Sequence, residues 1–222
     1  NIGAEGQVLM GCLASAYCMI EFGGKYNNTV LLIIMVVASI LMGAIWAVIP
    51  AICKAFWNTN ETLFTLMMNY VAMTLVSYFI MVKDKSGRSD LGIINERTGY
   101  GYLPNLFDRN YIFNILIVVG VTIFMFIYLK YSKQGYEISV VGESQNTARY
   151  VGINVKKVII RTMLISGALC GVTGMLLVAG KDHSINTNLV GGQGFTAILM
   201  SWLGQFNPFI MVVMTAIVVF LR

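Results

Sequence analysis

Charged residues are scarce in this sequence. Lys, Arg, Asp and Glu make up 11% of the 222 residues, whereas hydrophobic residues make up 57%. So few charges cannot cover a soluble globule of this size, and the composition therefore excludes that class. Catalytic motifs are equally sparse, because His183 is the single histidine and the sequence contains no HExxH, GxSxG or P-loop. We therefore expect no enzyme activity, no ATP hydrolysis, no metal site and no cofactor in this chain.

Neither the cysteines nor the net charge indicates a specific ligand. The four cysteines show no CxxC spacing and lie within or at the end of apolar runs, which favours packing over metal or disulfide roles; they are Cys12, Cys18, Cys53 and Cys170. The formal net charge is +5. Because the basic residues are spread among several loops, we expect contact with anionic membrane lipid and no nucleic-acid partner.

Long apolar runs dominate what is present. Four of them approach the roughly 20 residues needed to cross a bilayer: Val30–Cys53, Leu63–Val82, Tyr111–Leu129 and Val158–Ala179. Two shorter runs, Val8–Phe22 and Phe209–Leu221, predict partial or truncated helices. The pattern predicts an all-α, polytopic integral membrane protein. Since the first residue is not Met and the last run stops in mid-span, we expect residues 1–222 to be one transmembrane domain from a longer chain.

The long runs lack the groups that a self-powered carrier needs. None of them contains Asp or Glu, and Arg161 lies in the first turn of its run, where it can reach the membrane interface. Glu5 is the nearest titratable candidate. This scarcity favours an energy source on another subunit, although a stand-alone carrier or channel stays open.

A polar segment, Gly142–Lys157, separates two of the apolar runs. Its central residues predict a helix from Glu143 to Tyr150, with Glu143 suiting the N-terminus and Arg149 the C-terminus. Such a helix offers a docking surface at the membrane face. An ordinary solvated loop is the alternative.

The segment GESQNTARYVGINVKK and the run that follows it resemble the cytoplasmic coupling region of bacterial ABC-transporter permeases of the branched-chain amino acid, sugar and nucleoside importer superfamily. NIGAEGQVLMG, GGQGFTAILMSWLGQFNP and TLMMNY agree, and the first two are most similar to the nucleoside-type branch. The resemblance implies a multi-pass permease of the bacterial cytoplasmic membrane that translocates a small polar solute, most like nucleosides, with a sugar or another small solute as the alternative.

The same resemblance implies three protein partners: an ABC ATPase subunit, a second permease subunit and an extracytoplasmic solute-binding lipoprotein. The ATPase is expected to dock on the segment that contains Gly142, Glu143, Ala148, Arg149, Tyr150, Gly152 and Ile153. We therefore expect this segment in the cytoplasm.

NIGAEGQ and GGQGF each combine glycine with a polar side chain ahead of a short apolar run, as discontinuous half helices do. Such elements place polar groups at membrane depth. They predict a substrate pathway lined by Asn1, Glu5, Gln7, Asn69, Gln193 and Phe195. The alternatives are surface helix caps for the first group, a helix-to-helix hydrogen bond for Asn69, and packing for Phe195.

Charge does not settle the orientation. Alternating spans place seven basic residues on the side of Gly142–Lys157 (Lys54, Lys130, Lys133, Arg149, Lys156, Lys157 and Arg161) and seven on the other (Lys25, Lys83, Lys85, Arg88, Arg97, Arg109 and Lys181). On the second side, the loop Lys83–Asn110 either covers the external mouth or merely connects spans.

Small residues recur at helical spacing in two of the runs. Gly167, Gly171 and Gly174 share one run, and Ser39, Gly43 and Ala47 form a similar stripe on another. Both stripes predict close helix packing.

Overall fold

The computed structural model describes residues 1–85, 88–104 and 111–221. Within these ranges the regular structure is helical, apart from one antiparallel bridge between Asp90 and Asn186. The helices are α1 (Ala4–Phe22), α2 (Asn28–Trp57), α3 (Glu61–Lys83), α4 (Ile112–Tyr131), α5 (Lys133–Glu143), α6 (Gln145–Tyr150), α7 (Val155–Leu177), the π-helix η1 (Val178–Asp182), α8 (Gln193–Leu203) and α9 (Pro208–Leu221). The predicted all-α fold is confirmed.

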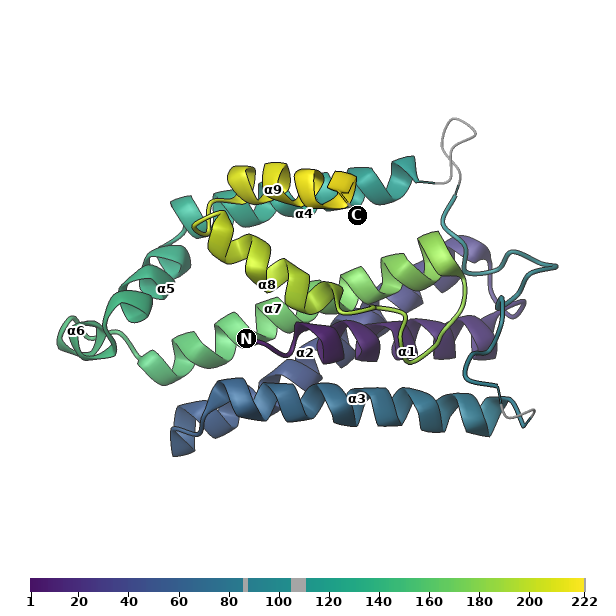
Figure 1. Ribbon diagram of the computed structural model, residues 1–222, viewed down its shortest axis with the longest axis horizontal. Coiled ribbons are helices and arrows are strands. Elements are labelled where there is room, and N and C mark those ends of the chain that lie inside the picture. The colour runs from purple at the N-terminus through teal and green to yellow at the C-terminus, as the bar shows by residue number, and fades with distance from the viewer. Residues whose placement is uncertain (86–87, 105–110, 222) are drawn as a thin grey trace.

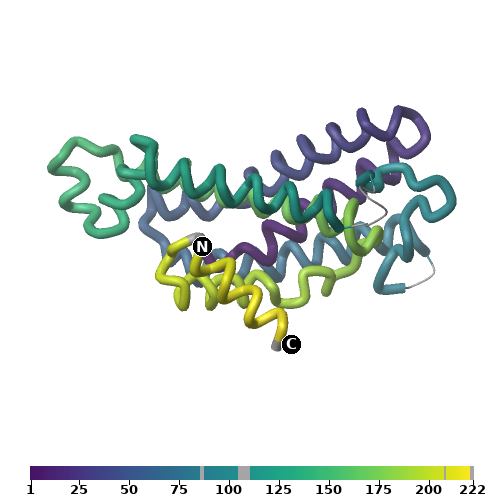
Figure 2. The backbone as a smooth tube through the Cα atoms, turned by 90° about the horizontal axis from the view of Figure 1, so that it is seen from above, coloured from purple at the N-terminus to yellow at the C-terminus, as the bar shows by residue number. Residues whose placement is uncertain are grey.

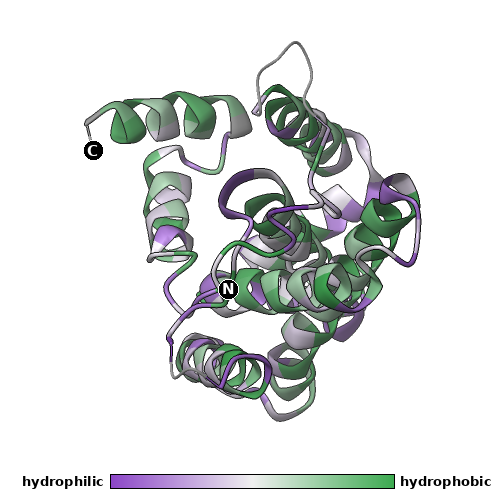
Figure 3. Ribbon diagram, turned by 90° about the vertical axis from the view of Figure 1, so that its right-hand side faces the viewer, coloured by the Kyte–Doolittle hydropathy of each residue, from purple (hydrophilic) through white to green (hydrophobic). Residues whose placement is uncertain are grey.

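Among the described residues, four helical segments are long and apolar enough to cross a membrane: Asn28–Trp57, Glu61–Lys83, Ile112–Tyr131 and Val155–Asp182. They coincide with the four long apolar runs, and the two shorter runs form α1 and α9. Apolar residues dominate the helices, and hydrophilic residues gather in the segments that connect them (Figure 3).

Helix α1 lies at the centre of the bundle. Of its 19 residues, 13 are buried, because α2, α3, α7 and α8 all pack around it. Its side chains Leu9 and Met19 meet residues of the neighbouring helices in one core, among them Met35 and Val76. A helix enclosed on all sides needs no polar face, which explains why α1 is apolar around most of its circumference.

Helices α2 and α7 approach each other through their small residues. A Cβ atom added at Gly171 would lie 2.1 Å from the backbone oxygen of Ser39, and one at Gly43 would lie 2.3 Å from the oxygen of Gly167. Gly174 makes the same kind of approach to the backbone oxygen of Val8 on α1, at 2.4 Å. The predicted packing role of both stripes is confirmed, because only glycine allows the backbones this close.

Helix α4 is joined to the bundle more loosely. No residue of α4 is buried, and its contacts run mainly to α5 and, through the rings of Phe126 and Phe209, to α9 (Figure 1). Those two ring centroids are 5.0 Å apart.

The two ends of the bundle differ. Helices α5 and α6 project from one end, which we call the α6 end, and the loop 88–104 lies at the opposite end (Figures 1 and 2). In this loop, Asn95 Nδ2 donates to the backbone oxygen of Met19 at 2.8 Å, and the Leu103 amide donates to that of Ala179 at 3.0 Å. The Tyr102 ring stacks on the imidazole of His183 at a centroid distance of 3.8 Å, and burial lowers the pKa of that imidazole.

The loop therefore lies over the ends of α1 and η1. Residues 86–87 and 105–110 of the predicted loop Lys83–Asn110, including Arg109, are outside the described residues.

Candidate functional site

The start of α1 carries a cluster of buried amide groups. Gln7 is buried, and its side chain exchanges hydrogen bonds with Asn1: Asn1 Nδ2 donates to Gln7 Oε1 at 3.0 Å, and Gln7 Nε2 donates to Asn1 Oδ1 at 3.3 Å. Asn1 Nδ2 also reaches the Ser166 hydroxyl of α7 at 3.1 Å. These bonds connect the first residues of the chain to α7.

Asn69 attaches the same segment to α3. Its Oδ1 accepts from the Gly6 amide at 2.9 Å, and its Nδ2 donates to the Ile2 carbonyl at 3.1 Å. Gly6 is required here, since an added Cβ atom would lie 2.8 Å from Asn69 Oδ1. Asn69 thus supplies hydrogen-bond partners for two backbone groups at the start of α1.

Glu5 connects α1 to the N-terminus of α8. Its Oε1 accepts from the Gly192 amide at 2.8 Å and its Oε2 accepts from the Gly194 amide at 2.9 Å. Gly191 and Gly192 have φ angles of 56° and 76°, a left-handed backbone that favours glycine. A carboxylate at this position satisfies two unpaired amides and suits the positive end of the helix dipole.

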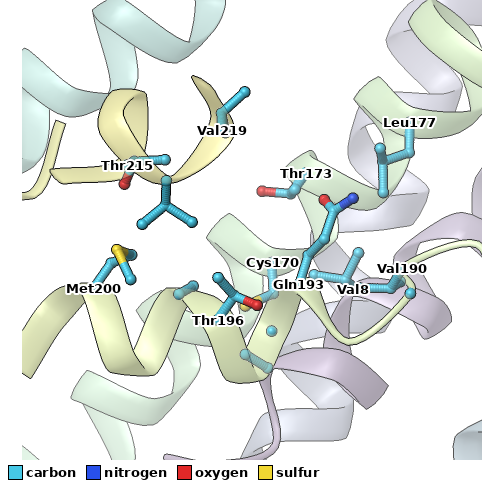
Figure 4. Close-up of a pocket in the computed structure, with 15 residues that line it drawn as sticks. Val8, Cys170, Thr173, Leu177, Val190, Gln193, Thr196, Met200, Thr215 and Val219 are labelled. Atoms are coloured by element: carbon cyan, nitrogen blue, oxygen red, sulfur yellow. The ribbon is translucent and has the colours of Figure 1, made fainter. Parts of the chain in front are cut away.

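A cavity of about 820 Å³ lies beside this junction, between α8 and α9 on one side and α1 and α7 on the other (Figure 4). Ala4 and Val8 contribute the wall from α1. The polar lining consists of neutral side chains: Thr173 of α7, Gln193 and Thr196 of α8, and Thr215 of α9. The side-chain amide of Gln193, which lines the cavity, makes no hydrogen bond within the described part of the chain.

The predicted pathway residues fall into two groups. Gln193 lines the cavity, whereas the other five residues do not. Glu5 binds the start of α8 at the cavity wall, Asn1, Gln7 and Asn69 hydrogen-bond the first residues of the chain to one another and to α3 and α7, and Phe195 is 40% exposed on α8. The threonines of the cavity were missed, because a threonine in an apolar run most often bonds its own helix, as Thr173 and Thr215 also do here.

The segment Gly142–Ile153 forms the tip of the α6 end. Helix α6 begins after Ser144, whose hydroxyl accepts from the Thr147 amide at 3.3 Å. The prediction that Glu143 starts this helix is wrong, because Glu143 is instead the last residue of α5 and Ser144 is the better N-cap.

The tip presents most of its side chains to solvent. Gly142, Glu143, Arg149 and Gly152 are exposed, and Tyr150 is 92% exposed. Ala148 is fully buried, and its carbonyl accepts from the Ile153 amide at 2.9 Å, which closes the turn back to α7. Helix α6 is therefore short and exposed, and the buried Ala148 and its hydrogen bond to Ile153 hold it against the turn to α7.

Comparison with known proteins gives one consistent picture. The sequence profile of a family described as the permease component of the branched-chain amino acid transport system matches residues 1–222. The guanosine ABC transporter permease protein NupP of Bacillus subtilis is 31% identical over 209 residues, covering 92% of this chain and 59% of that protein.

Two further relatives carry different substrates in their names. The glucose ABC transporter permease protein TsgB13 of Haloferax volcanii is 28% identical over 216 residues (92% of this chain, 56% of that protein). The nucleoside ABC transporter permease protein NupB of Lactococcus lactis is 24% identical over 219 residues (94% and 60%). The chain thus spans less than two thirds of each of these relatives. No solved structure matches it significantly.

Proposed function

This chain belongs to the permease-component family of the branched-chain amino acid transport systems, and we propose that it is the membrane-spanning permease of an ATP-driven importer for nucleosides. The family resemblance seen in the sequence is confirmed, and the chain is a multi-pass membrane protein. The observation that carries the proposal is the match of the family profile along the whole chain, together with the names of the nucleoside permeases among its relatives.

The size and lining of the cavity favour binding of an uncharged polar solute. Its volume of about 820 Å³ lies within the ~300–1,000 Å³ of small-molecule sites, and its lining contains no ionisable group except Cys170. Neutral hydroxyl and amide groups suit the ribose and base of a nucleoside. We assign Gln193 to direct contact with the solute and Phe195 to the approach along α8. Glu5 holds the start of α8 at the cavity wall, and Asn1, Gln7 and Asn69 fix the first residues of the chain against α3 and α7.

The partners follow from this proposal. A separate ATPase docks on Gly142–Ile153, which places the α6 end in the cytoplasm, and a solute-binding lipoprotein delivers solute to the opposite end. A second permease subunit completes the pathway. ATP-driven closure of the ATPase moves α5 and α6, and the packed helices rock around the cavity to give alternating access.

The test is uptake into proteoliposomes that contain the full-length permease, its ATPase and its binding protein. Guanosine should accumulate only with ATP, and a hydrolysis-deficient ATPase should abolish accumulation. A glucose transporter is the second candidate, because TsgB13 is a glucose permease. Accumulation of glucose but not guanosine would establish that alternative, and accumulation without ATP would indicate a carrier that works alone.

A double mutant tests the docking segment. Replacing Glu143 and Arg149 with Ala should uncouple transport without affecting membrane insertion, because both side chains are exposed outside the spans. Exposed ion pairs are worth about 0–1 kcal/mol, so either change alone should reduce uptake by no more than about fivefold. Co-purification of the ATPase and uptake at equal expression are the measurements. Unchanged uptake by the double mutant would remove the docking assignment.

A further inference from the structure

Helix α5 is connected to α7 by one prominent polar contact. Arg161 Nη2 donates to Glu137 Oε2 at 3.0 Å, and the two side chains are 29% and 21% exposed. Arg161 Nε is buried without a hydrogen-bond partner in the described part of the chain, so the guanidinium depends on Glu137 for compensation. Because both charges are largely removed from water, the pair resists separation more than an exposed pair does.

Apolar packing between the two helices is incomplete. A cavity of about 200 Å³ separates α5 from the ends of α2 and α7, and its apolar walls include Ile138 and Val141 of α5 and Val158 and Ile159 of α7. This space beside α5 leaves room for the helix to tilt against α7. The Glu137–Arg161 ion pair is then the contact through which a movement of α5 also moves α7.

Helix α7 leads from this pair to the larger cavity. Cys170, Thr173 and Leu177 line that cavity, 9 to 16 residues beyond Arg161. At 1.5 Å per residue, α7 spans roughly 14–24 Å between the pair and these side chains. Because α7 is one continuous α-helix from Val155 to Leu177, a shift at Arg161 is carried along its length.

We propose that the Glu137–Arg161 ion pair transmits movement of the docking segment to α7, and that both residues are positioning residues for transport. This inference rests on the proposed function of Gly142–Ile153 as the ATPase contact. Glu137 lies in α5, which leads directly into that segment, and Arg161 lies in the helix that forms the cavity wall.

The test compares Glu137→Gln with the unmodified permease in the reconstituted complex. The variant keeps the shape of the side chain but removes its charge. Solute taken up per ATP hydrolysed should fall about tenfold, within the ~5- to 150-fold typical of coupling between sites. Stimulation of ATP hydrolysis by the loaded binding protein should fall as well, since that signal crosses the same contact. The charge-swapped double mutant, Glu137→Arg with Arg161→Glu, should restore most of both.

Lys54 and Glu61 provide the matched control. Their ion pair of 3.4 Å lies at the same end of the bundle but joins α2 to α3. Both side chains line the small cavity beside α5, but their ion pair holds no residue of α5, so Lys54→Gln should leave uptake per ATP within about twofold of the unmodified value. An equal loss in both variants would show a general effect of charge at this end and would overturn the proposal.

Three results decide the remaining cases. An unchanged ratio and unchanged stimulation in Glu137→Gln overturn the proposal. If that variant fails to insert, the charge-swapped double mutant decides, because recovered coupling supports transmission and its absence overturns it. If the unmodified complex takes up no nucleoside, the proposed function is wrong whatever the role of the ion pair. The role of the ion pair is then tested by the stimulation of ATP hydrolysis alone.

Discussion

Replacing Gly171 with Leu should prevent stable folding of the bundle. A Cβ atom at this position would lie 2.1 Å from the backbone oxygen of Ser39 and 2.8 Å from its carbonyl carbon. Backbone atoms cannot rotate away as a flexible side chain can, so α2 and α7 must separate. The penalty should exceed about 3 kcal/mol, the upper end of the usual cost of overpacking. The yield of monodisperse protein in detergent and its thermal unfolding are the measurements.

Gly120 of α4 supplies the control for this change. No atom lies within 4 Å of a Cβ atom added there, so Gly120→Leu places the same side chain on an apolar helix without a clash. Its yield and melting temperature should stay close to those of the unmodified protein. Equal stability of the Gly171 and Gly120 variants would contradict the close approach of α2 and α7.

Replacing Glu5 with Leu should abolish uptake by releasing α8 from α1. The change removes the acceptors of both the part-buried Gly192 amide and the buried Gly194 amide, which are then left without these partners. Hydrogen bonds to charged groups contribute about 1.5–3 kcal/mol each. A loss of about 3 kcal/mol from the competent arrangement lowers uptake roughly 100-fold. Glu5→Gln keeps one acceptor oxygen and should show an intermediate loss.

The control for Glu5 is Glu96, an exposed acidic residue of the loop at the opposite end. Glu96→Leu should insert and transport normally, because no buried amide depends on it. Uptake measures the loss of transport in the Glu5 variant. Limited proteolysis of the 183–193 segment measures the release of α8 from α1. Full activity of Glu5→Leu would show that α8 is positioned by other contacts.

The spans could be predicted from sequence because their signal is local. A continuous apolar run fixes where a helix crosses the membrane, and the glycine stripes at Gly43 and Gly171 show which faces pack closely. Helix α5 could not be predicted in this way, since KQGYEISVVGE mixes polar and apolar residues over a short length. Its start depends on the Ser132 hydroxyl, which accepts from the Gly135 amide at 2.9 Å.

The site could be predicted only in part, because its contacts join distant parts of the chain. Sequence suggested that the segments around Glu5 and Gln193 are related, and the structure brings them together at the wall of one cavity. No sequence pattern indicates that Asn69 binds the backbone of Ile2 and Gly6, or that Thr215 lies opposite Gln193. Those relations depend on helix packing, across more than 60 residues of chain for Asn69 and between α8 and α9 for Thr215.

The bond between Glu5 and α8 also constrains how the protein is made. The two amides that bind this carboxylate lie 187 and 189 residues later in the chain. At about 5–20 residues per second, a ribosome needs roughly 10–40 s to synthesise that interval. During this time the carboxylate of Glu5 has none of its final partners, and an unpaired carboxylate is costly in lipid. The start of α1 must therefore wait in water or beside the insertion machinery, and α1 reaches its central position only after α8 has emerged.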